Sequence, residues 1–255
     1  MSNKDIKTEN YHLMFGDCLE RMKEIPDRSV DLILTDPPYG TTQCKWDSVI
    51  SFEFMWVELK RIIKPNGAIL LFGSEPFSSA LRMSNIKQYK YDWIWEKPKG
   101  TGHLNAKKQP LRYTENIHVF YKKQCLYHPQ KTDGHKPSNI SGRRRKETTV
   151  YGAFHNIISG GQTDRYPKNI LKFNNVNSAH GIVHPTQKPV DLLEYLIKTY
   201  TNEGETVLDF TAGSFSTGVA SLNTNRKFIG IEMDENYFDI GVNRMKENCE
   251  VDKPL

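Results

Sequence analysis

The chain has 255 residues, of which 37% are hydrophobic and 25% are charged, so it can bury one sizeable core and is neither a disordered segment nor a mini-protein. Its net charge of +5 is unevenly spread, because residues 97–146 carry 13 Lys and Arg against only Glu115 and Asp133. This asymmetry predicts a basic lobe that faces a polyanion, on an otherwise acidic body.

Neither an export signal nor a membrane span is visible. The N-terminal residues are polar, and a run of about 18 apolar residues, enough to span a membrane, does not occur. The four cysteines are far apart and form no Cys-x-x-Cys pair: Cys18, Cys44, Cys125 and Cys249. We therefore expect a reduced, cytoplasmic protein with no metal site and no membrane partner.

The first part of the chain has the pattern of alternating strands and helices. The apolar, β-rich run at residues 30–35 predicts a buried parallel strand. Apolar spacing over residues 52–63 predicts a helix that is stopped by the Pro-Asn-Gly at 65–67, and residues 68–72 predict the next strand. This alternation is typical of an α/β fold.

The middle of the chain, residues 97–183, is rich in Gly, Pro, Asn, His and Lys and predicts mostly loops, with one strand at 116–121. Regular patterns then return. They predict a helix at 189–200, a strand at 206–208, a glycine-containing turn with a following helix, and a strand at 227–231. Strands and helices thus alternate on both sides of a loop-rich middle region.

The first candidate motif is Leu-Thr-Asp-Pro-Pro-Tyr-Gly at residues 34–40, where the first predicted strand ends. Ligands of open α/β sheets lie outside the carboxyl ends of strands. Pro37 and Pro38 fix φ and supply no N–H donors, so Asp36 and the nearby carbonyls form a rigid set of acceptors that suits an amino group.

These acceptors could activate the exocyclic amine of adenine or cytosine, which is a poor nucleophile because its lone pair conjugates into the ring. If the Asp36 carboxylate and the Pro37 carbonyl each accept an N–H, the lone pair can point at an electrophilic methyl group. Tyr39 would stack on a base flipped out of the duplex. An ordinary strand-to-loop turn is the alternative interpretation of this motif.

The second candidate motif, residues 207–221, predicts a strand, a glycine-containing turn and a helix start. Phe215 replaces a glycine of the dinucleotide fingerprint, and Val-Ala at 219–220 replace the Lys-Ser or Lys-Thr of a P-loop. The turn therefore suits a nucleoside cofactor without phosphates. Glu232 ends the next predicted strand, 23 positions after Asp209, a spacing that resembles that of a ribose-binding carboxylate. A solvated strand-end carboxylate is the alternative for Glu232.

In this order, the motifs closely resemble those of the beta-class S-adenosylmethionine-dependent DNA amino-methyltransferases, in which the catalytic motif precedes the cofactor motif. The resemblance spans residues 13–240. It rests on Gly16-Asp17-Cys18-Leu19 before the first predicted strand, Asp36-Pro37-Pro38-Tyr39, Trp95-Glu96-Lys97-Pro98, His184-Pro185-Thr186-Gln187-Lys188-Pro189, and Asp209 to Gly218.

The resemblance implies a Rossmann-like, mostly parallel sheet of seven strands with helices on both faces. Residues 1–99 would form the catalytic half of the methyltransferase domain, and residues 181–255 its cofactor-binding half. Residues 100–180 would be a basic target-recognition insertion. S-adenosylmethionine would be the methyl donor, and no metal is implied.

The resemblance also implies a role for individual residues. The target amine and base would be held by Asp36, Pro37, Pro38 and Tyr39. The cofactor would be bound by Asp209, Phe210, Thr211, Gly213 and Ser214 near its methionine part, by Glu232 at the ribose, by Asp17 near the adenine, and by Thr186 and Lys188 at the methionine carboxylate. Capping of the following helix is the alternative for residues 184–189.

Two departures from the family bear on function. Many members have a glycine where this chain has Phe215, which we interpret as tolerated because Gly213 and Ser214 are kept. Asp36, rather than Ser, before Pro-Pro-Tyr resembles the N6-adenine members more than the N4-cytosine members. Methylation at carbon 5 of cytosine would need a Cys after Pro, and no cysteine of the chain follows a proline.

The predicted function is therefore methylation of the N6 amino group of adenine in duplex DNA, with the target base flipped out. N4-cytosine methylation, an RNA substrate and a non-catalytic nucleic-acid-binding protein are the alternatives. DNA phosphates would be contacted by Lys107, Lys108, Arg112, Arg143, Arg144, Arg145 and Lys146, although solvated charged loops are the alternative for each. A homodimer and a cognate restriction enzyme are further expected partners.

Overall fold

The computed structural model describes residues 4–40, 48–139, 160–175 and 187–251, with side chains up to residue 248. Contacts divide the chain into two units. The larger comprises residues 1–128 and 169–255, and the smaller comprises residues 129–168. Residues 100–128, which the sequence prediction assigned to the recognition region, thus belong to the larger unit, which also holds the sheet.

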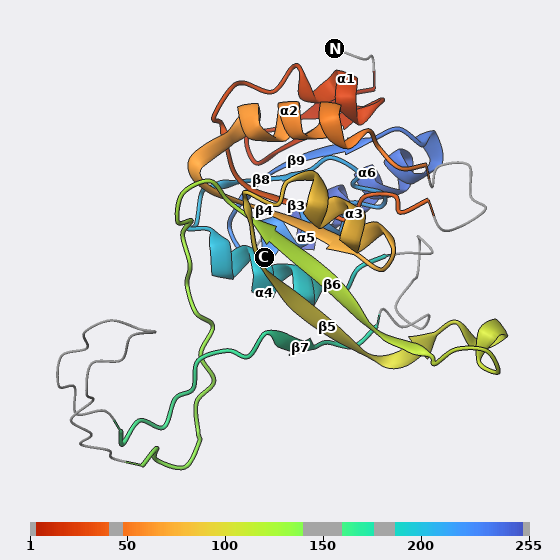
Figure 1. Ribbon diagram of the computed structural model, residues 1–255. Coiled ribbons are helices and arrows are strands. Elements are labelled where there is room, and N and C mark those ends of the chain that lie inside the picture. The colour runs from red at the N-terminus through yellow and green to blue at the C-terminus, as the bar shows by residue number, and fades with distance from the viewer. Residues whose placement is uncertain (1–3, 41–47, 140–159, 176–186, 252–255) are drawn as a thin grey trace. The chain divides into compact units, whose positions relative to one another are not determined.

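The described residues form a nine-stranded sheet in the order β1-β2-β9-β8-β3-β4-β6-β5-β7 (Figure 1). The strands are β1 (Ile6–Lys7), β2 (Tyr11–Phe15), β3 (Val30–Thr35), β4 (Ile63–Gly73), β5 (Tyr89–Thr101), β6 (Arg112–Phe120), β7 (Ile170–Lys172), β8 (Thr206–Asp209) and β9 (Lys227–Glu232). Strands β2, β9, β8, β3 and β4 are parallel to one another, and β6 is antiparallel to β4 and β5.

The prediction of a Rossmann-like, mostly parallel sheet is confirmed, and the strand count is corrected from seven to nine. The difference lies at the two edges, where the short strands β1 and β7 pair with β2 and β5. Strand β2 was not predicted as the first strand, although it precedes Gly16. Nor was β5 predicted, although Tyr89, Tyr91, Trp93 and Trp95 alternate along it with the period of a strand.

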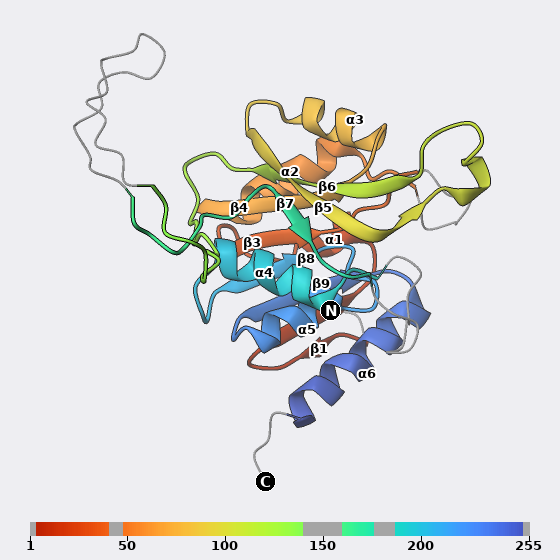
Figure 2. The same ribbon diagram turned by 90° about the horizontal axis from the view of Figure 1, so that it is seen from below.

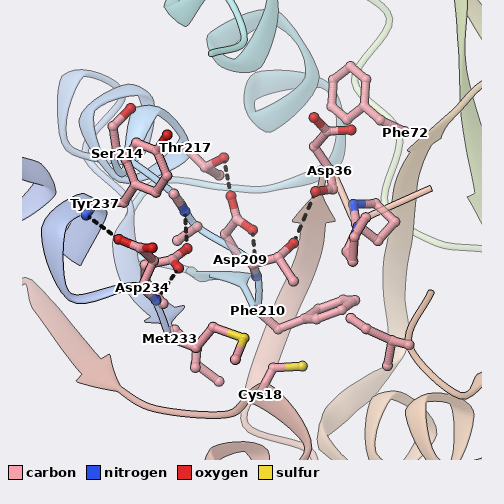
Figure 3. A pocket seen from close by; sticks show the side chains of 18 of the residues that line it. Cys18, Asp36, Phe72, Asp209, Phe210, Ser214, Thr217, Met233, Asp234 and Tyr237 are labelled. Atoms are coloured by element: carbon pink, nitrogen blue, oxygen red, sulfur yellow. Dashed lines mark hydrogen bonds between the residues drawn. The ribbon is translucent and has the colours of Figure 1, made fainter. Parts of the chain in front are cut away.

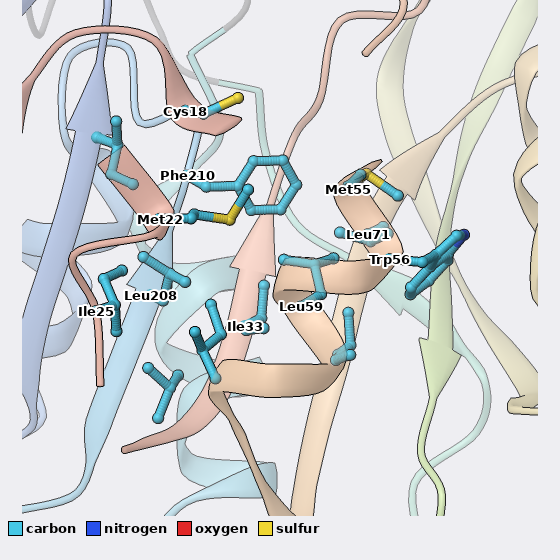
Figure 4. Close-up of a cluster of buried hydrophobic side chains, with 14 of the residues drawn as sticks. Cys18, Met22, Ile25, Ile33, Met55, Trp56, Leu59, Leu71, Leu208 and Phe210 are labelled. Carbon is cyan, nitrogen blue, oxygen red and sulfur yellow. The ribbon is translucent and has the colours of Figure 1, made fainter. Parts of the chain in front are cut away.

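Helices cover both faces of the sheet (Figures 1 and 2). One face carries α1 (Cys18–Met22), α2 (Phe52–Ile62) and α3 (Phe77–Ser84), and the other carries α4 (Val190–Tyr200), α5 (Ser216–Asn223) and α6 (Glu235–Val251). Strand β3 is buried on both faces because Ile33 packs towards α1 and α2, while Leu32 and Leu34 pack towards α4. Figure 4 shows the cluster of buried side chains on the α1, α2 and α3 face, which includes Met22, Ile33, Trp56 and Phe210.

The chain order reverses between β3 and β8, which are adjacent and pair through Leu32 with Val207. From β3 the chain continues through α2 to β4 on one side, and from β8 through α5 to β9 on the other. The loops after β3 and β8 therefore diverge at the carboxyl ends of these strands and leave a crevice between them. Such a switch point is where ligands bind in open α/β folds.

No helix among the described residues is long and apolar enough to cross a membrane.

Candidate active site

A cavity of about 320 Å³ lies at the switch point (Figure 3), a volume typical of small-molecule sites. The loops that follow β2, β3, β8 and β9 contribute to its wall. Every predicted catalytic or cofactor residue with a described position lines it: Asp17, Asp36, Pro37, Pro38, Tyr39, Lys188, Asp209, Phe210, Thr211, Gly213, Ser214 and Glu232. Thr186 lies outside the described residues. The fold thus brings together two motifs that are about 170 positions apart in the sequence.

Asp36 begins the loop after β3, and both of its carboxylate oxygens have partners. Oδ1 accepts a hydrogen bond from the Tyr39 hydroxyl, and Oδ2 accepts one from the Lys188 ammonium. Burial raises the pKa of Asp36, while the neighbouring Lys188 charge opposes that rise. The backbone carbonyl of Asp36 accepts a hydrogen bond from Thr211 Oγ1 at 3.1 Å. The loop after β3 is thus bonded directly to the turn after β8, residues 209–215, which is predicted to bind the cofactor and is called the cofactor turn below.

Tyr39 is held at both ends of its side chain. Its ring stacks on Phe77, with centroids 5.0 Å apart and an interplanar angle of 29°. Its hydroxyl lies within hydrogen-bond distance of two carboxylates, Asp36 and, at 2.9 Å, Glu115. The ring orientation is therefore fixed before any base arrives, which suits a residue expected to stack on a flipped base.

Lys188 lies at the Asp36 carboxylate. Its ammonium contacts Asp36 and also Glu115 Oε1 at 3.1 Å, and it lies 5.0 Å from the centroid of the Phe72 ring. The contact with the methionine carboxylate that the resemblance implied stays a prediction. The structure adds a second relationship, because a buried Lys188 is paired with the side chain that is expected to accept the target amine.

Glu115 was not predicted at this site, but it contacts Tyr39 and Lys188, which line the cavity, and it pairs with Lys97, which was not predicted there either. Glu115 lies on β6 with its side chain buried, and its Oε2 is paired with the Lys97 ammonium from β5. Lys188 and Lys97 lower the pKa of Glu115 to about 2, against the effect of burial. The sequence gives only an indirect indication of their role. Glu115 is one of two acidic residues in the strongly basic segment 97–146, and Lys97 lies in the stretch 95–98 that resembles the family.

Asp209, at the end of β8, organises the turn that follows it. Its Oδ1 accepts hydrogen bonds from Thr35 Oγ1 at 2.8 Å and from the Thr211 amide at 3.2 Å, and its Oδ2 accepts from Thr217 Oγ1 at 2.7 Å (Figure 3). Burial raises the pKa of Asp209 to about 6. Its oxygens are thus engaged within the chain, where they shape the cofactor turn.

Glu232 closes the other side of the turn. Its Oε2 accepts from the Gly213 amide at 2.7 Å and its Oε1 from the Asp234 amide at 2.7 Å. Gly213 adopts a positive φ of 52°, which glycine tolerates without strain. Each carboxylate oxygen of Glu232 keeps a further lone pair, so this residue can still accept a hydroxyl donor from the pocket.

Phe215 does not obstruct the pocket. Its backbone is left-handed, with φ 56° and ψ 36°, and its fully buried ring packs against Phe228 and Phe238 in the cluster beneath α6. Gly241 makes room for it, since a Cβ there would lie 2.4 Å from the Phe215 ring. The turn therefore keeps its shape with a phenylalanine in place of glycine because the ring points into the core.

Further residues position the cofactor turn and its surroundings. Arg244, from α6, donates to the carbonyl of Ser214, to Ser214 Oγ at 2.9 Å and to Ser216 Oγ at 3.2 Å. Asp17 is exposed at the N-terminus of α1, where its Oδ1 accepts from the amides of Leu19 and Glu20. Arg244 was not predicted, because it lies 30 positions from Ser214 and carries no recognisable motif.

Three of the predicted DNA-binding residues lie on the hairpin formed by β5 and β6. Lys107, Lys108 and Arg112 are exposed, and Arg112 donates to Ser74 Oγ at 3.1 Å. Asn116 of β6 pairs with Gly73, the last residue of β4, and the two strands are antiparallel. The part of the hairpin before Asn116 therefore continues beyond the carboxyl ends of the parallel strands, where the cavity lies. Arg143, Arg144, Arg145 and Lys146 lie outside the described residues.

The described residues thus form an α/β fold with a cavity at the switch point, where the Asp36 loop and the glycine turn after Asp209 lie side by side. A family model described as DNA methylase, covering N6 and N4 methyltransferases, matches residues 30–243, and the chain belongs to this family. The family transfers methyl groups from S-adenosylmethionine.

Two relatives illustrate the similarity in sequence. The chain is 29% identical over 247 residues to the DNA adenine methyltransferase YhdJ of Escherichia coli, an alignment that covers 91% of this chain and 82% of the relative. It is 28% identical over 248 residues to the type II methyltransferase M.HpaI of Haemophilus parainfluenzae, covering 91% and 73% of the two chains.

Solved structures show the same fold. The complex of M1.HpyAVI with S-adenosylmethionine has a TM-score of 0.63 and 23% identity, covering 92% of this chain and 98% of the other. The cytosine-N4-specific PvuII DNA methyltransferase has a TM-score of 0.65 and 18% identity, covering 96% and 92%. Similarity in fold is therefore shared with a cytosine-N4 enzyme.

Proposed function

We propose that this protein transfers a methyl group from S-adenosylmethionine to the N6 amino group of adenine in DNA. One observation carries the proposal: the Asp36 carboxylate lines the same cavity as the cofactor turn, and its loop is bonded to that turn through Thr211. An amine held by Asp36 and the Pro37 carbonyl would therefore face a methyl donor bound in the turn. Holding two reactants in such geometry is a large part of catalysis for a direct transfer.

The residues of the turn fit the cofactor. Glu232 can accept the ribose hydroxyls, and Asp17 lines the same cavity where the adenine is expected. Phe210 and Ile231 supply apolar wall, and Arg244 fixes the Ser214 end of the turn. When bound, S-adenosylmethionine supplies the electrophilic methyl on its sulfonium. The chain's own task is to orient the amine and to exclude water.

Adenine is favoured over cytosine by two considerations. Asp36 stands where N4-cytosine members tend to have serine, and YhdJ, which is similar over most of the chain, is named an adenine methyltransferase. The structural similarity to the PvuII enzyme keeps N4-cytosine as the competing candidate, because its fold is alike and its chemistry needs the same acceptors.

The DNA is proposed to approach from the sheet edge at which the cavity opens, because the basic hairpin extends from that edge. Lys107, Lys108 and Arg112 would contact phosphates there, and Arg143 to Lys146 would add to them. Extrusion of the target base into the cavity follows from the need to reach its amine. A homodimer and a cognate restriction enzyme stay predictions.

The test is mass spectrometry of nucleosides from the DNA of a methylation-free host that expresses the wild type or Asp36→Ala. We expect N6-methyladenine with the wild type alone. Detection of N4-methylcytosine instead would show that the substrate is cytosine and would be consistent with the same mechanism. If neither product forms although the protein is soluble, methylation of RNA and binding without catalysis are separated by assaying methyl transfer to single-stranded RNA.

A further inference from the structure

Glu115 has no assigned role, although it contacts Tyr39 and Lys188, two side chains that line the cavity. Its Oε1 lies 2.9 Å from the Tyr39 hydroxyl and 3.1 Å from the Lys188 ammonium, the same two groups that bind Asp36. Its Oε2 binds Lys97. Two carboxylates therefore share one hydroxyl and one ammonium, and Lys97 is bound to Glu115.

This sharing creates a competition that matters for the target amine. The Tyr39 hydroxyl has a single proton and can donate it to one carboxylate at a time. When it points at Asp36, it occupies one oxygen, while Lys188 occupies the other. An amine N–H would then share an oxygen of Asp36 with one of these two donors, which weakens the negative charge that the amine meets. A second acceptor next to Asp36 reduces this competition.

The surrounding charges allow Glu115 to act as that second acceptor. Lys97 from β5 and Lys188 from the segment before α4 balance the charges of Glu115 and Asp36. Among the described residues, Tyr39 and Asp209, at the end of β8, are further titratable groups near Asp36. Glu115 and Lys97 are both largely buried, so their ion pair is weakly screened by solvent. A protonated Glu115 could not accept in this way, and its two ammonium partners favour the ionised form.

We propose that Glu115 is a positioning residue for Asp36: it takes over the Tyr39 hydroxyl and the Lys188 ammonium, so that the Asp36 oxygens can accept the N–H groups of the target amine. The inference rests on the proposed methylation of an exocyclic amine and deepens it. Glu115 itself contacts neither the base nor the cofactor in this role.

The primary test compares Glu115→Gln with the wild type by the pH dependence of kcat/KM and by kcat. We expect kcat to fall about tenfold, because a charged acceptor is lost. We also expect the acid limb to move to lower pH, because removing a negative neighbour lowers the pKa of Asp36. Affinity for S-adenosylmethionine should stay within twofold. A structural defect alone would not move the acid limb.

Two further variants test the direction of the shift and whether it depends on the Tyr39 hydroxyl. Lys97→Met leaves Glu115 less compensated, so the acid limb should move to higher pH, opposite to Glu115→Gln. In a Tyr39→Phe background the competing hydroxyl is gone, so Glu115→Gln should lower kcat by a smaller factor than in the wild type. Glu96→Gln is the matched control, because Glu96 neighbours Lys97 on β5 and pairs with Lys172, away from the cavity.

The outcomes separate this inference from the proposed function. If the wild type yields no methylated adenine or cytosine, the proposed function fails. If the wild type is active and Glu115→Gln keeps both kcat and the acid limb, the positioning role is wrong. Should Glu115→Gln fail to fold, as judged by thermal unfolding, an unshifted acid limb in Lys97→Met would overturn the proposal equally.

Discussion

The hydroxyl of Thr35 donates to the carboxylate of Asp209 at 2.8 Å, and its oxygen accepts the Phe210 amide at 3.0 Å. These two bonds join the last residue of β3 to the last residue of β8 and to the residue after it. The two strands are followed by the loop that is predicted to bind the amine and by the turn that is predicted to bind the cofactor. The bonds are buried, so water cannot replace them. The relative position of the two motifs depends on this connection.

We therefore expect Thr35→Val to lower the free energy of unfolding by about 1–3 kcal/mol, because it keeps the side-chain shape but leaves buried polar groups unpaired. Affinity for S-adenosylmethionine should fall as well. Urea unfolding and calorimetry measure the two effects. Thr199→Val is the control, because Thr199 is equally buried and its hydroxyl donates to a carbonyl of its own helix. Equal effects in both variants would contradict a special role for Thr35.

The second prediction concerns Arg244, which binds the carbonyl and hydroxyl of Ser214. Arg244→Met should raise the Kd for S-adenosylmethionine about tenfold, because the turn loses a charge-assisted bond that holds its shape. Lys246→Met, at an exposed position of the same helix, is the control. Calorimetry decides the matter, and an unchanged Kd in Arg244→Met would show that the turn holds its shape without this residue.

The third prediction follows from the pKa of Asp209, which burial raises to about 6. In an unfolded chain an aspartate titrates near 3.9, so the folded state binds this proton more tightly. The buried charge therefore lowers stability above about pH 6, by about 3 kcal/mol, and this cost disappears as pH falls towards 4.

Asp209→Asn removes the charge, so the difference in unfolding free energy between this variant and the wild type should change between pH 6 and 4. Above pH 6 the difference should be constant. Urea unfolding across this range measures it, with Asp239→Asn at an exposed position as the control. A difference that does not vary with pH would be inconsistent with a raised pKa.

The fourth prediction concerns the basic hairpin. Replacing Lys107 and Lys108 by Ser should reduce the slope of log K against log salt for DNA binding by about two, one for each lost phosphate contact. The control replaces Lys87 and Lys227, which are exposed and precede or begin strands at the opposite sheet edge. Fluorescence anisotropy at several salt concentrations gives the slopes. Equal slopes for both double variants would mean that DNA binds elsewhere.

The sequence alone determined the order of the motifs and the type of fold. Residues 30–35 are mostly apolar and β-branched or leucine, and they are followed by Asp36-Pro37-Pro38, so a buried strand and a rigid acceptor loop follow from local patterns. The glycine turn after Asp209 is local in the same sense. Strand β5 was missed although its alternating aromatic residues carry a signal, because its second half, with Lys97, Pro98, Lys99 and Gly100, resembles the loop-rich region that follows.

The tertiary structure alone decided which charges meet beside Asp36. Glu115 and Lys97 lie on neighbouring antiparallel strands, and Lys188 lies more than 70 residues further along the chain. No local pattern relates such positions, because their distance depends on strand register and on how the loops pack at the sheet edge. The direction of the Phe215 ring is likewise decided by the space at Gly241, which only the packing of α6 creates.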